Sequence, residues 1–153
     1  MLNIVTGVGP RVGSSFVMRQ AKVAGLEVAG SKYLHGALPL EGNLGGYYDL
    51  TADEAIYLTQ GVAKVWPVSL TLVRPTIDRM LILERQDKEA QAASIIKQAQ
   101  REGTTADPKI VMEFCSDCLD RFLACERAPK NILRVNTEDL YNEIGDILNF
   151  LGD

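Results

Sequence analysis

Residues 6–16 of the sequence read TGVGPRVGSSF, and they follow directly on the apolar run LNIV at residues 2–5. An apolar run, a glycine-rich turn and a helical segment, in that order, are typical of the first strand, loop and helix of an α/β domain. The first amides of a helix lack partners within the helix, and its dipole is positive at that end. The stretch therefore predicts an α/β fold with an anion site after its first strand.

The residue types in this loop suit an anion. Gly9 and Gly13 allow the backbone to approach a ligand closely, Ser14 and Ser15 supply hydroxyl donors, and Arg11 supplies a planar charged fork. The alternative is a glycine turn that only links the strand to the helix. Because these residue types converge within a few positions, we interpret the loop as an anion site.

The loop departs from the nucleotide-binding pattern GxxxxGK[ST] at one position. The lysine that reaches the β and γ phosphates is replaced by Ser14, which follows Gly13. The predicted strand at 80–84 also lacks a terminal aspartate that would support magnesium. An ordinary kinase or nucleoside triphosphatase is therefore disfavoured, and no metal is expected.

The remaining chain alternates apolar runs with helical segments. The runs are continuous, as in strands that are covered on both faces. We predict a three-layer α/β sandwich with a parallel sheet of about four to five strands, similar to P-loop nucleoside triphosphatases, as a single domain over residues 1–153. The predicted strands are Leu2–Thr6, Val62–Trp66, Met80–Glu84 and Ile132–Val135.

Capping residues mark the helices. The predicted helices run from Gly13 to about Ala24, after the capping box of Thr51 and Glu54, from Asp87 to Gly103, from Asp107 with Pro108 at its first position, and from about Glu138 to the end. The fourth of these helices is expected to bury one apolar stripe, made of Val111, Cys115, Cys118, Phe122 and Cys125. Packing in the core is the preferred interpretation of its cysteines, with a metal or redox CxxC as the alternative.

Composition limits the classes of function. The chain has 153 residues, 46% of them hydrophobic, and a net charge of -4, so we expect no nucleic-acid partner. It has no run of about 20 apolar residues that could span a membrane and no secretory leader pattern. Three clustered cysteines do not suggest a disulfide framework. We therefore expect a cytoplasmic protein.

Several segments resemble one known family, and they occur in the same order along the chain. GPRVGSS at residues 9–15 resembles the 5'-phosphosulfate loop of sulfotransferases. Four further segments are similar to short bacterial sulfotransferase-like proteins. They are AGLEV with GGYYDL (24–28 and 45–50), AKVW (63–66), RMLILERQDKEAQAAS (79–94) and ILRVNTEDLYNEIGDILNFLG (132–152).

The resemblance implies a donor, 3'-phosphoadenosine 5'-phosphosulfate (PAPS), and residues that bind it. Gly9, Arg11, Gly13, Ser14 and Ser15 would hold the 5'-phosphosulfate. Two further residues, Arg85 at the end of the third predicted strand and Ser94 on the following helix, would hold the 3'-phosphate. The alternatives for those two are a solvated charge and an ordinary hydroxyl on a helix surface.

Catalytic roles are harder to assign. Arg11 would stabilise charge on the leaving nucleotide, and Lys64 could assist the transfer or simply extend from the sheet edge to water. His35 and Asp49 are the candidate bases, with a surface histidine and a solvated carboxylate as the alternatives. Both bases lie in or next to the irregular glycine-rich segment 31–49, which is the expected substrate loop.

The sequence thus predicts a sulfotransferase that passes the sulfuryl group of PAPS to a hydroxyl or amine of a small-molecule or glycan acceptor. An atypical P-loop kinase or phosphotransferase is one alternative, and it would bind ATP with magnesium. A catalytically silent nucleotide-binding protein is the other. The oligomeric state is not predicted.

Overall fold

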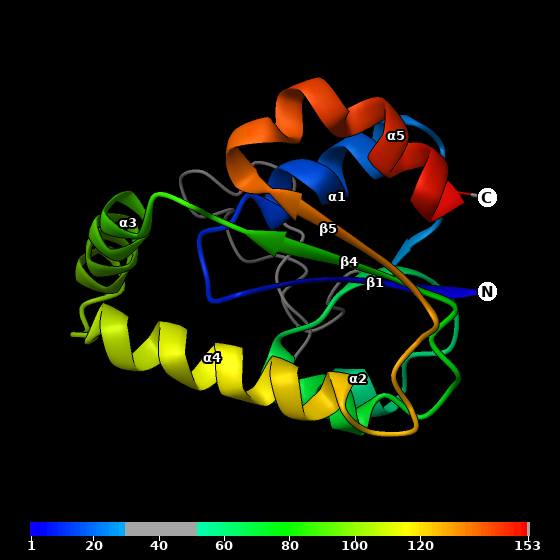
Figure 1. Cartoon of the computed structure of the whole chain (residues 1–153), viewed down its shortest axis with the longest axis horizontal. Coiled ribbons are helices and arrows are strands. Elements are labelled where there is room, and N and C mark those ends of the chain that lie inside the picture. The colour runs from blue at the N-terminus through cyan, green and yellow to red at the C-terminus, as the bar shows by residue number, and fades with distance from the viewer. Residues whose placement is uncertain (30–51, 153) are drawn as a thin grey trace.

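The structure is a computed structural model, and it describes residues 1–29 and 52–152. Its strands form a five-stranded sheet, parallel at every pairing, in the order β2-β3-β1-β4-β5 (Figure 1). The strands are β1 (Leu2–Gly7), β2 (Val28–Ala29), β3 (Gly61–Lys64), β4 (Arg79–Glu84) and β5 (Asn131–Asn136). The predicted α/β class with a parallel sheet is therefore confirmed.

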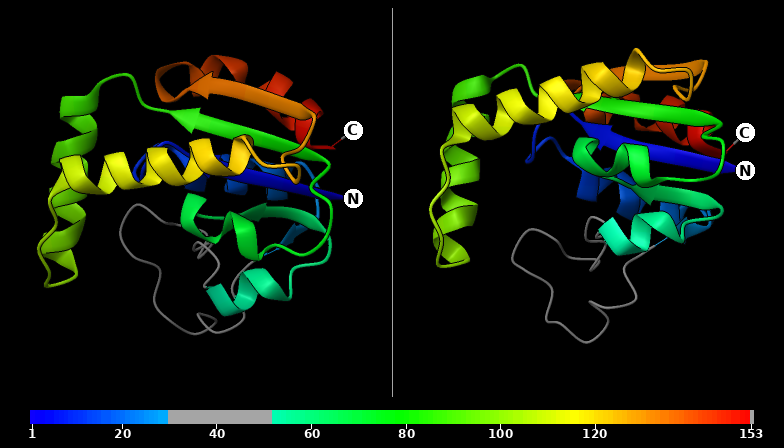
Figure 2. Two further views of the ribbon diagram at one scale, coloured as in Figure 1. Left: turned by 60° about the horizontal axis from the view of Figure 1, so that its bottom comes forward. Right: turned by 90° about the horizontal axis from the view of Figure 1, so that it is seen from below.

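Helices lie on both faces of this sheet. The first face is covered by α1 and α5, and the opposite face by α2, α4 and a 3-10 helix, η1 (Figures 1 and 2). The helix α3 lies beyond the carboxyl ends of the strands, toward which the arrowheads point (Figure 1). The bounds are α1 Ser14–Val23, α2 Ala52–Ile56, η1 Pro67–Leu72, α3 Lys88–Arg101, α4 Pro108–Leu123, a second 3-10 helix η2 Thr137–Asp139, and α5 Leu140–Gly152.

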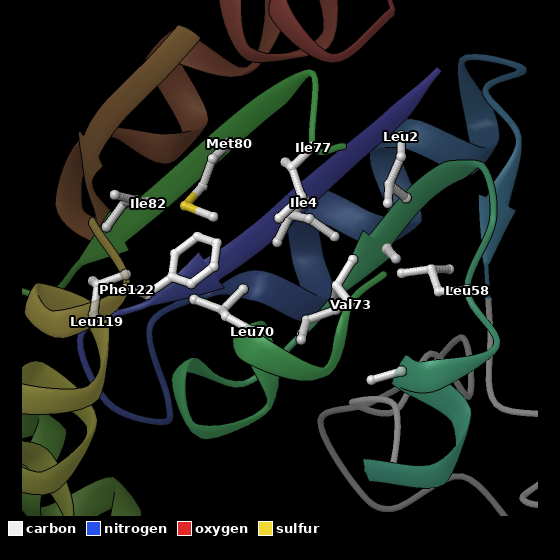
Figure 3. Close-up of a cluster of buried hydrophobic side chains, with 13 residues drawn as sticks. Leu2, Ile4, Leu58, Leu70, Val73, Ile77, Met80, Ile82, Leu119 and Phe122 are labelled. Atoms are coloured by element: carbon white, nitrogen blue, oxygen red, sulfur yellow. The ribbon is translucent and has the colours of Figure 1, made fainter. Parts of the chain in front are cut away.

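Two hydrophobic clusters hold these layers together, one on each face. Alternation along β1 sends Ile4 to the cluster under α4 and η1 and Val5 to the cluster under α1 and α5. The first cluster includes the ring of Phe122, which points from α4 toward the sheet (Figure 3). Both faces of the central strands are buried, which explains why their sequences are continuous apolar runs.

The helix starts follow the predicted caps. The carboxylate of Asp87 accepts a hydrogen bond from the amide of Ala90 at 2.9 Å. Asp107 accepts hydrogen bonds from the amides of Lys109 and Ile110 at 3.1 and 3.4 Å. These two caps are confirmed, whereas Thr51 of the third predicted cap lies outside the described residues.

The predicted cysteine stripe of α4 is wrong in part. Cys115 is buried, but Cys118 is half-buried and Cys125 is exposed beyond the helix end. The buried face instead runs through Cys115, Leu119 and Phe122, which are spaced four and three residues apart. Cys118 directly precedes Leu119, and successive residues of a helix point in different directions. The side chain of Cys118 therefore lies at the edge of the buried face.

Two strand predictions also need correction. The strand predicted at Val62–Trp66 ends at Lys64, because Pro67 opens η1 and Trp66 leads into it. The short edge strand β2 was not predicted, since two residues are too few to form a recognisable apolar run.

The strand order places a crevice at the carboxyl ends of β1 and β4. After β1 the chain passes through α1 to β2 on one side, and after β4 it passes through α3 and α4 to β5 on the other side. Connections that leave two neighbouring strands in opposite directions open a crevice there, and this is where parallel sheets bind ligands. The loop after β1 and the residue after β4 meet at this point.

Over residues 1–29 and 52–152, the structure contains no helix long and apolar enough to cross a membrane.

Candidate functional site

The loop between β1 and α1 has an unusual backbone. The torsion φ is 88° at Gly9, 64° at Arg11 and 89° at Gly13. Glycine adopts such values without strain, but a residue with a Cβ atom does so at a cost of about 1 kcal/mol. Arg11 is the one non-glycine residue with positive φ in the described part of the chain. Strain of this kind is characteristic of functional loops.

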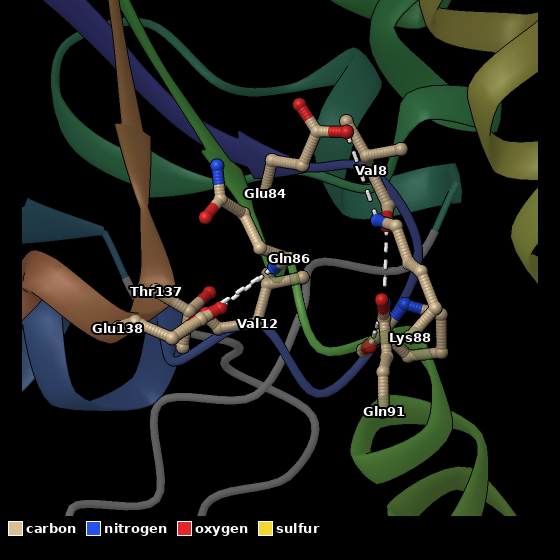
Figure 4. A network of polar contacts seen from close by, with 9 residues as sticks. Val8, Val12, Glu84, Gln86, Lys88, Gln91, Thr137 and Glu138 are labelled. Atoms are coloured by element: carbon tan, nitrogen blue, oxygen red, sulfur yellow. Dashed lines mark hydrogen bonds and ion pairs between the residues drawn. The ribbon is translucent and has the colours of Figure 1, made fainter.

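Side chains from other elements hold the carbonyl groups of this loop. The amide nitrogen of Gln91, on α3, donates to the carbonyl oxygens of Val8 and Pro10 at 3.1 and 2.8 Å (Figure 4). The hydroxyl of Thr137 donates to the carbonyl oxygen of Val12 at 2.6 Å. Gln91 is completely buried. The carbonyl oxygens, which would repel an anion, are thus bound by the protein itself.

A fourth carbonyl of the loop is bound by a charged group. The guanidinium of Arg85, the first residue after β4, donates to the carbonyl oxygen of Arg11 at 3.3 Å. Arg85 therefore links the end of β4 to the loop after β1. The two segments border the crevice between the diverging strands.

The start of α1 borders the same cavity. Its capping residue is Gly13, which has no capping side chain, and its first turn contains no acidic residue. The amides of Phe16 and Val17 donate to the carbonyl of Gly13. The amides of Ser14 and Ser15 have no acceptor among residues 1–29 and 52–152. The electrostatic field at this helix end favours a negative group.

The loop, α1 and α3 border a cavity of about 380 Å³. Its lining includes every predicted site residue that the structure describes. These residues are Gly9, Arg11, Gly13, Ser14, Ser15, Lys64, Arg85 and Ser94. The candidate bases His35 and Asp49 lie outside the described residues, so their predicted roles stay predictions.

The described lining of the cavity is strongly cationic. It contains Arg11, Arg19, Lys64, Arg85 and Arg101, with Glu102 as the one carboxylate among the lining residues that the structure describes. The chain as a whole carries a net charge of -4, so the positive charge is a local property of this cavity. A low-dielectric cleft lined by one sign of charge attracts ions of the other sign.

Arg11 is the lining residue whose contacts and charge environment are best defined. Its Nε donates to the hydroxyl of Ser94, on α3, at 2.8 Å. Burial lowers the pKa of Arg11 below its usual value, and the positive charges of Arg101 and Arg85 lower it further. Three guanidinium groups from the loop, α3 and the end of β4 thus act on one region, where a bound anion would relieve their repulsion.

Lys64 is a further cation of the lining, and it comes from β3. The ammonium of Lys64, the last residue of β3, donates to the hydroxyl of Ser15 at 3.4 Å. This contact brings the end of β3 to the start of α1. The cavity therefore presents one group of donors around Lys64 and α1, and another around Arg11 and α3.

Two lining residues have buried polar atoms without partners in the described structure, the hydroxyl of Thr6 and Nε of Arg19. Thr6, the last residue but one of β1, has only 3% of its surface exposed. A buried donor that lacks a partner is costly, and such atoms are common where a ligand completes the hydrogen bonding. Both atoms are consistent with a polar ligand.

The residues missed by sequence reasoning include Gln91 and Arg101. A signal for them existed, because Gln91, Ser94, Gln98 and Arg101 are spaced three, four and three residues apart. That spacing gives a helix one polar face. A polar face opposite an apolar one is also the ordinary pattern of a surface helix, so the signal alone could not identify a site.

Within the described ranges, no group of three or more histidine, cysteine, aspartate or glutamate side chains could hold a metal ion. The metal interpretation of Cys115 and Cys118 therefore gains nothing from the packing of α4.

Comparison of the sequence with protein-family models finds no matching family, and comparison with curated proteins finds no significant match. The function is therefore inferred from the site itself.

The first prediction concerns the anchor of the loop. The substitution Gln91→Leu removes the amide that donates to the carbonyl oxygens of Val8 and Pro10. Because buried carbonyl oxygens without a donor are costly, we expect the free energy of unfolding to fall by about 2 to 4 kcal/mol. The matched control is Gln100→Leu on the exposed side of the same helix, which should change stability by less than about 0.5 kcal/mol. Urea denaturation measures both. Equal effects in the two variants would contradict the anchoring role.

The second prediction concerns the start of α1. Gly13 and Gly25 have nearly the same φ, 89° and 85°, but a Cβ at Gly13 would lie 2.5 Å from Cδ1 of Leu140, whereas a Cβ at Gly25 meets nothing within 4 Å. Gly25→Ala should cost about 1 kcal/mol through backbone strain alone. Gly13→Ala should cost about 2 to 4 kcal/mol, because steric overlap is added. Equal losses of stability in urea would show that α5 gives way at this contact.

Proposed function

We propose that this protein binds PAPS and is a sulfotransferase that transfers the sulfuryl group to a hydroxyl or amine acceptor. The observation that carries the proposal is the hydrogen bond between Arg11 Nε and Ser94, at 2.8 Å. It unites the phosphosulfate-like loop with a helix more than 80 residues away in sequence, in the same cavity as Lys64 and the start of α1. The cavity thus has two groups of anion donors, and PAPS has two separated anionic ends.

The chain can support sulfuryl transfer through groups that bind developing charge. In the reaction, the acceptor oxygen or nitrogen bonds to sulfur, the bond from sulfur to the 5'-phosphate oxygen breaks, and 3',5'-bisphosphoadenosine leaves. The amides of Ser14 and Ser15 and the ammonium of Lys64 would stabilise the negative charge on that oxygen. The proton of the acceptor would pass to a base, for which His35 and Asp49 are the candidates.

The donor set argues against the alternative of magnesium with ATP. Magnesium is held in proteins mainly by carboxylate oxygens and waters. Among the described lining residues, Glu102 is the one carboxylate, and it accepts a hydrogen bond from Gln98 at 3.2 Å. A ligand whose charge is matched by arginine and lysine, without a metal, fits this set better.

A silent nucleotide-binding protein remains the second candidate, and one observation favours it. The lining residues that the structure describes include no histidine, and Glu102 is their one carboxylate. A protein of this kind would bind the nucleotide through the same cations and would lack transfer activity. Only an activity assay separates the two candidates.

The third prediction tests the proposed function. Addition of 3',5'-bisphosphoadenosine at 100 times its dissociation constant should stabilise the protein by about 2.7 kcal/mol, seen as a rise in melting temperature. ATP with magnesium should give a smaller rise at the same concentration. Arg11→Ala should weaken binding roughly tenfold to a hundredfold, since a charge-assisted donor is lost. Arg121→Ala, an exposed change on α4, is the control and should bind as the wild type does.

The outcomes separate the candidates. No stabilisation by the bisphosphate at millimolar concentration would reject both nucleotide-binding proposals. Stabilisation combined with transfer of labelled sulfate from PAPS to members of an acceptor panel would support the sulfotransferase. Stabilisation without transfer to any acceptor would favour the silent binder.

A further inference from the structure

The segment after β5 contacts both of the segments that border the crevice. The strand β5 runs parallel to β4, and its last residue, Asn136, lies opposite Glu84 at the end of β4. The next two residues, Thr137 and Glu138, open the short helix η2. Because carboxyl ends of parallel strands share one edge of the sheet, η2 lies at the same edge as the loop after β1, and Thr137 lines the cavity.

Thr137 and the residues after it hold the loop after β1. The hydroxyl of Thr137 donates to the carbonyl oxygen of Val12 at 2.6 Å. Leu140, the first residue of α5, lies so close to the loop that a Cβ on Gly13 would be 2.5 Å from its Cδ1. The polypeptide from η2 into α5 is therefore packed directly against the start of α1.

Glu138 holds the turn after β4. Its two carboxylate oxygens lie 2.6 and 3.2 Å from the amide nitrogen of Gln86, which donates to them (Figure 4). Hydrogen bonds to a charged acceptor are shorter and stronger than those between neutral groups. Gln86 directly follows Arg85, whose guanidinium donates to the carbonyl oxygen of Arg11 at 3.3 Å. The carboxylate thus restrains the backbone from which Arg85 extends to the loop.

The charge of Glu138 has the wrong sign for direct contact with an anion. Glu138 is not among the described lining residues, although it directly follows Thr137, which is. A carboxylate beside a cationic cavity lowers the attraction of that cavity for anions. Its contact with Gln86 gives it a different role, because that contact fixes the position of a cation.

We propose that Glu138 is a positioning residue for anion binding. It holds the turn after β4 through the amide of Gln86 and so keeps Arg85 against the loop after β1. Its neighbour Thr137 holds that loop from the same short helix, so two adjacent residues set the separation of the two segments. The choice of a nucleotide as the probe rests on the proposed function, whereas the positioning role applies to any anion in the cavity.

The fourth prediction uses the direction of the effect on affinity. Loss of a negative charge beside a cationic cavity should by itself strengthen anion binding, whereas loss of a positioning residue should weaken it. Calorimetry on the full chain should show that Glu138→Ala weakens binding of 3',5'-bisphosphoadenosine about threefold to tenfold. Glu138→Gln should bind within about twofold of the wild type, because its amide oxygen can still accept from Gln86. Both residues are exposed, so the melting temperature of the free protein should change little.

Asp139→Ala is the matched control. It removes the same charge from the adjacent exposed residue, which makes no hydrogen bond or ion pair with the residues that the structure describes. This variant should bind the bisphosphate as tightly as the wild type or slightly more tightly.

A second comparison tests whether Glu138 acts through Arg85. In an Arg85→Ala background, Glu138→Ala should cause no further loss of affinity, because the group that it positions is gone. A general structural defect would weaken binding equally in both backgrounds.

The outcomes separate the positioning role from the proposed function. If Glu138→Ala binds as tightly as Asp139→Ala, or weakens binding equally with and without Arg85, the positioning role is wrong even though the protein binds the bisphosphate. If the wild type does not bind the bisphosphate, the proposed function fails. The same variants compared with inorganic phosphate should then still show the weaker binding of Glu138→Ala, and a wild type that binds neither probe would overturn both proposals.

Discussion

The site depends on one buried contact, the hydrogen bonds from the side-chain amide of Gln91 to the carbonyl oxygens of Val8 and Pro10. Both hydrogens of one amide group are used, and the side chain has no exposed surface. The contact fixes α3 against the loop after β1. It therefore sets the positions of Ser94 and Arg101, which lie further along the same face of α3. Together with the hydrogen bond from Arg11 to Ser94, it joins the loop after β1 to α3.

The second constraint is electrostatic. Arg11, Arg85 and Arg101 repel one another, and Arg11 also has a strained backbone with φ of 64°. Both features reduce the stability of the free protein, and a bound anion would relieve the repulsion. Active and binding sites commonly sacrifice stability in this way. In a chain of net charge -4, a cavity this cationic also concentrates anionic ligands near the loop.

Predictions from the sequence were most accurate for features that depend only on neighbouring residues. The caps at Asp87 and Asp107 and the buried strands follow from a few neighbouring residues, and the structure confirms them. The predicted stripe was wrong at Cys118 and Cys125, because the direction in which α4 faces the sheet is set by packing, which buries Leu119 beside the predicted Phe122. The edge strand β2 exists only because β3 lies beside it.

The residues of the candidate site also differ in whether neighbouring residues were enough to predict them. Arg11, Ser14 and Ser15 are close in sequence and were predicted from the loop itself. Arg85 and Ser94 were predicted only from resemblance, because nothing local connects them with the loop. Gln91 and Arg101 were missed, since a polar residue on a helix looks the same whether it faces water or a cavity.

The sequence by itself determined where the chain can turn and where helices begin, because glycine torsions and capping hydrogen bonds involve residues only a few positions apart. It also predicts an anion site in the loop after β1, through Gly13 and the serines that follow. Only the tertiary structure decided which cations meet at that loop. Lys64, Arg85 and Arg101 are brought together by the order of parallel strands, which places the carboxyl ends of β3, β1 and β4 side by side.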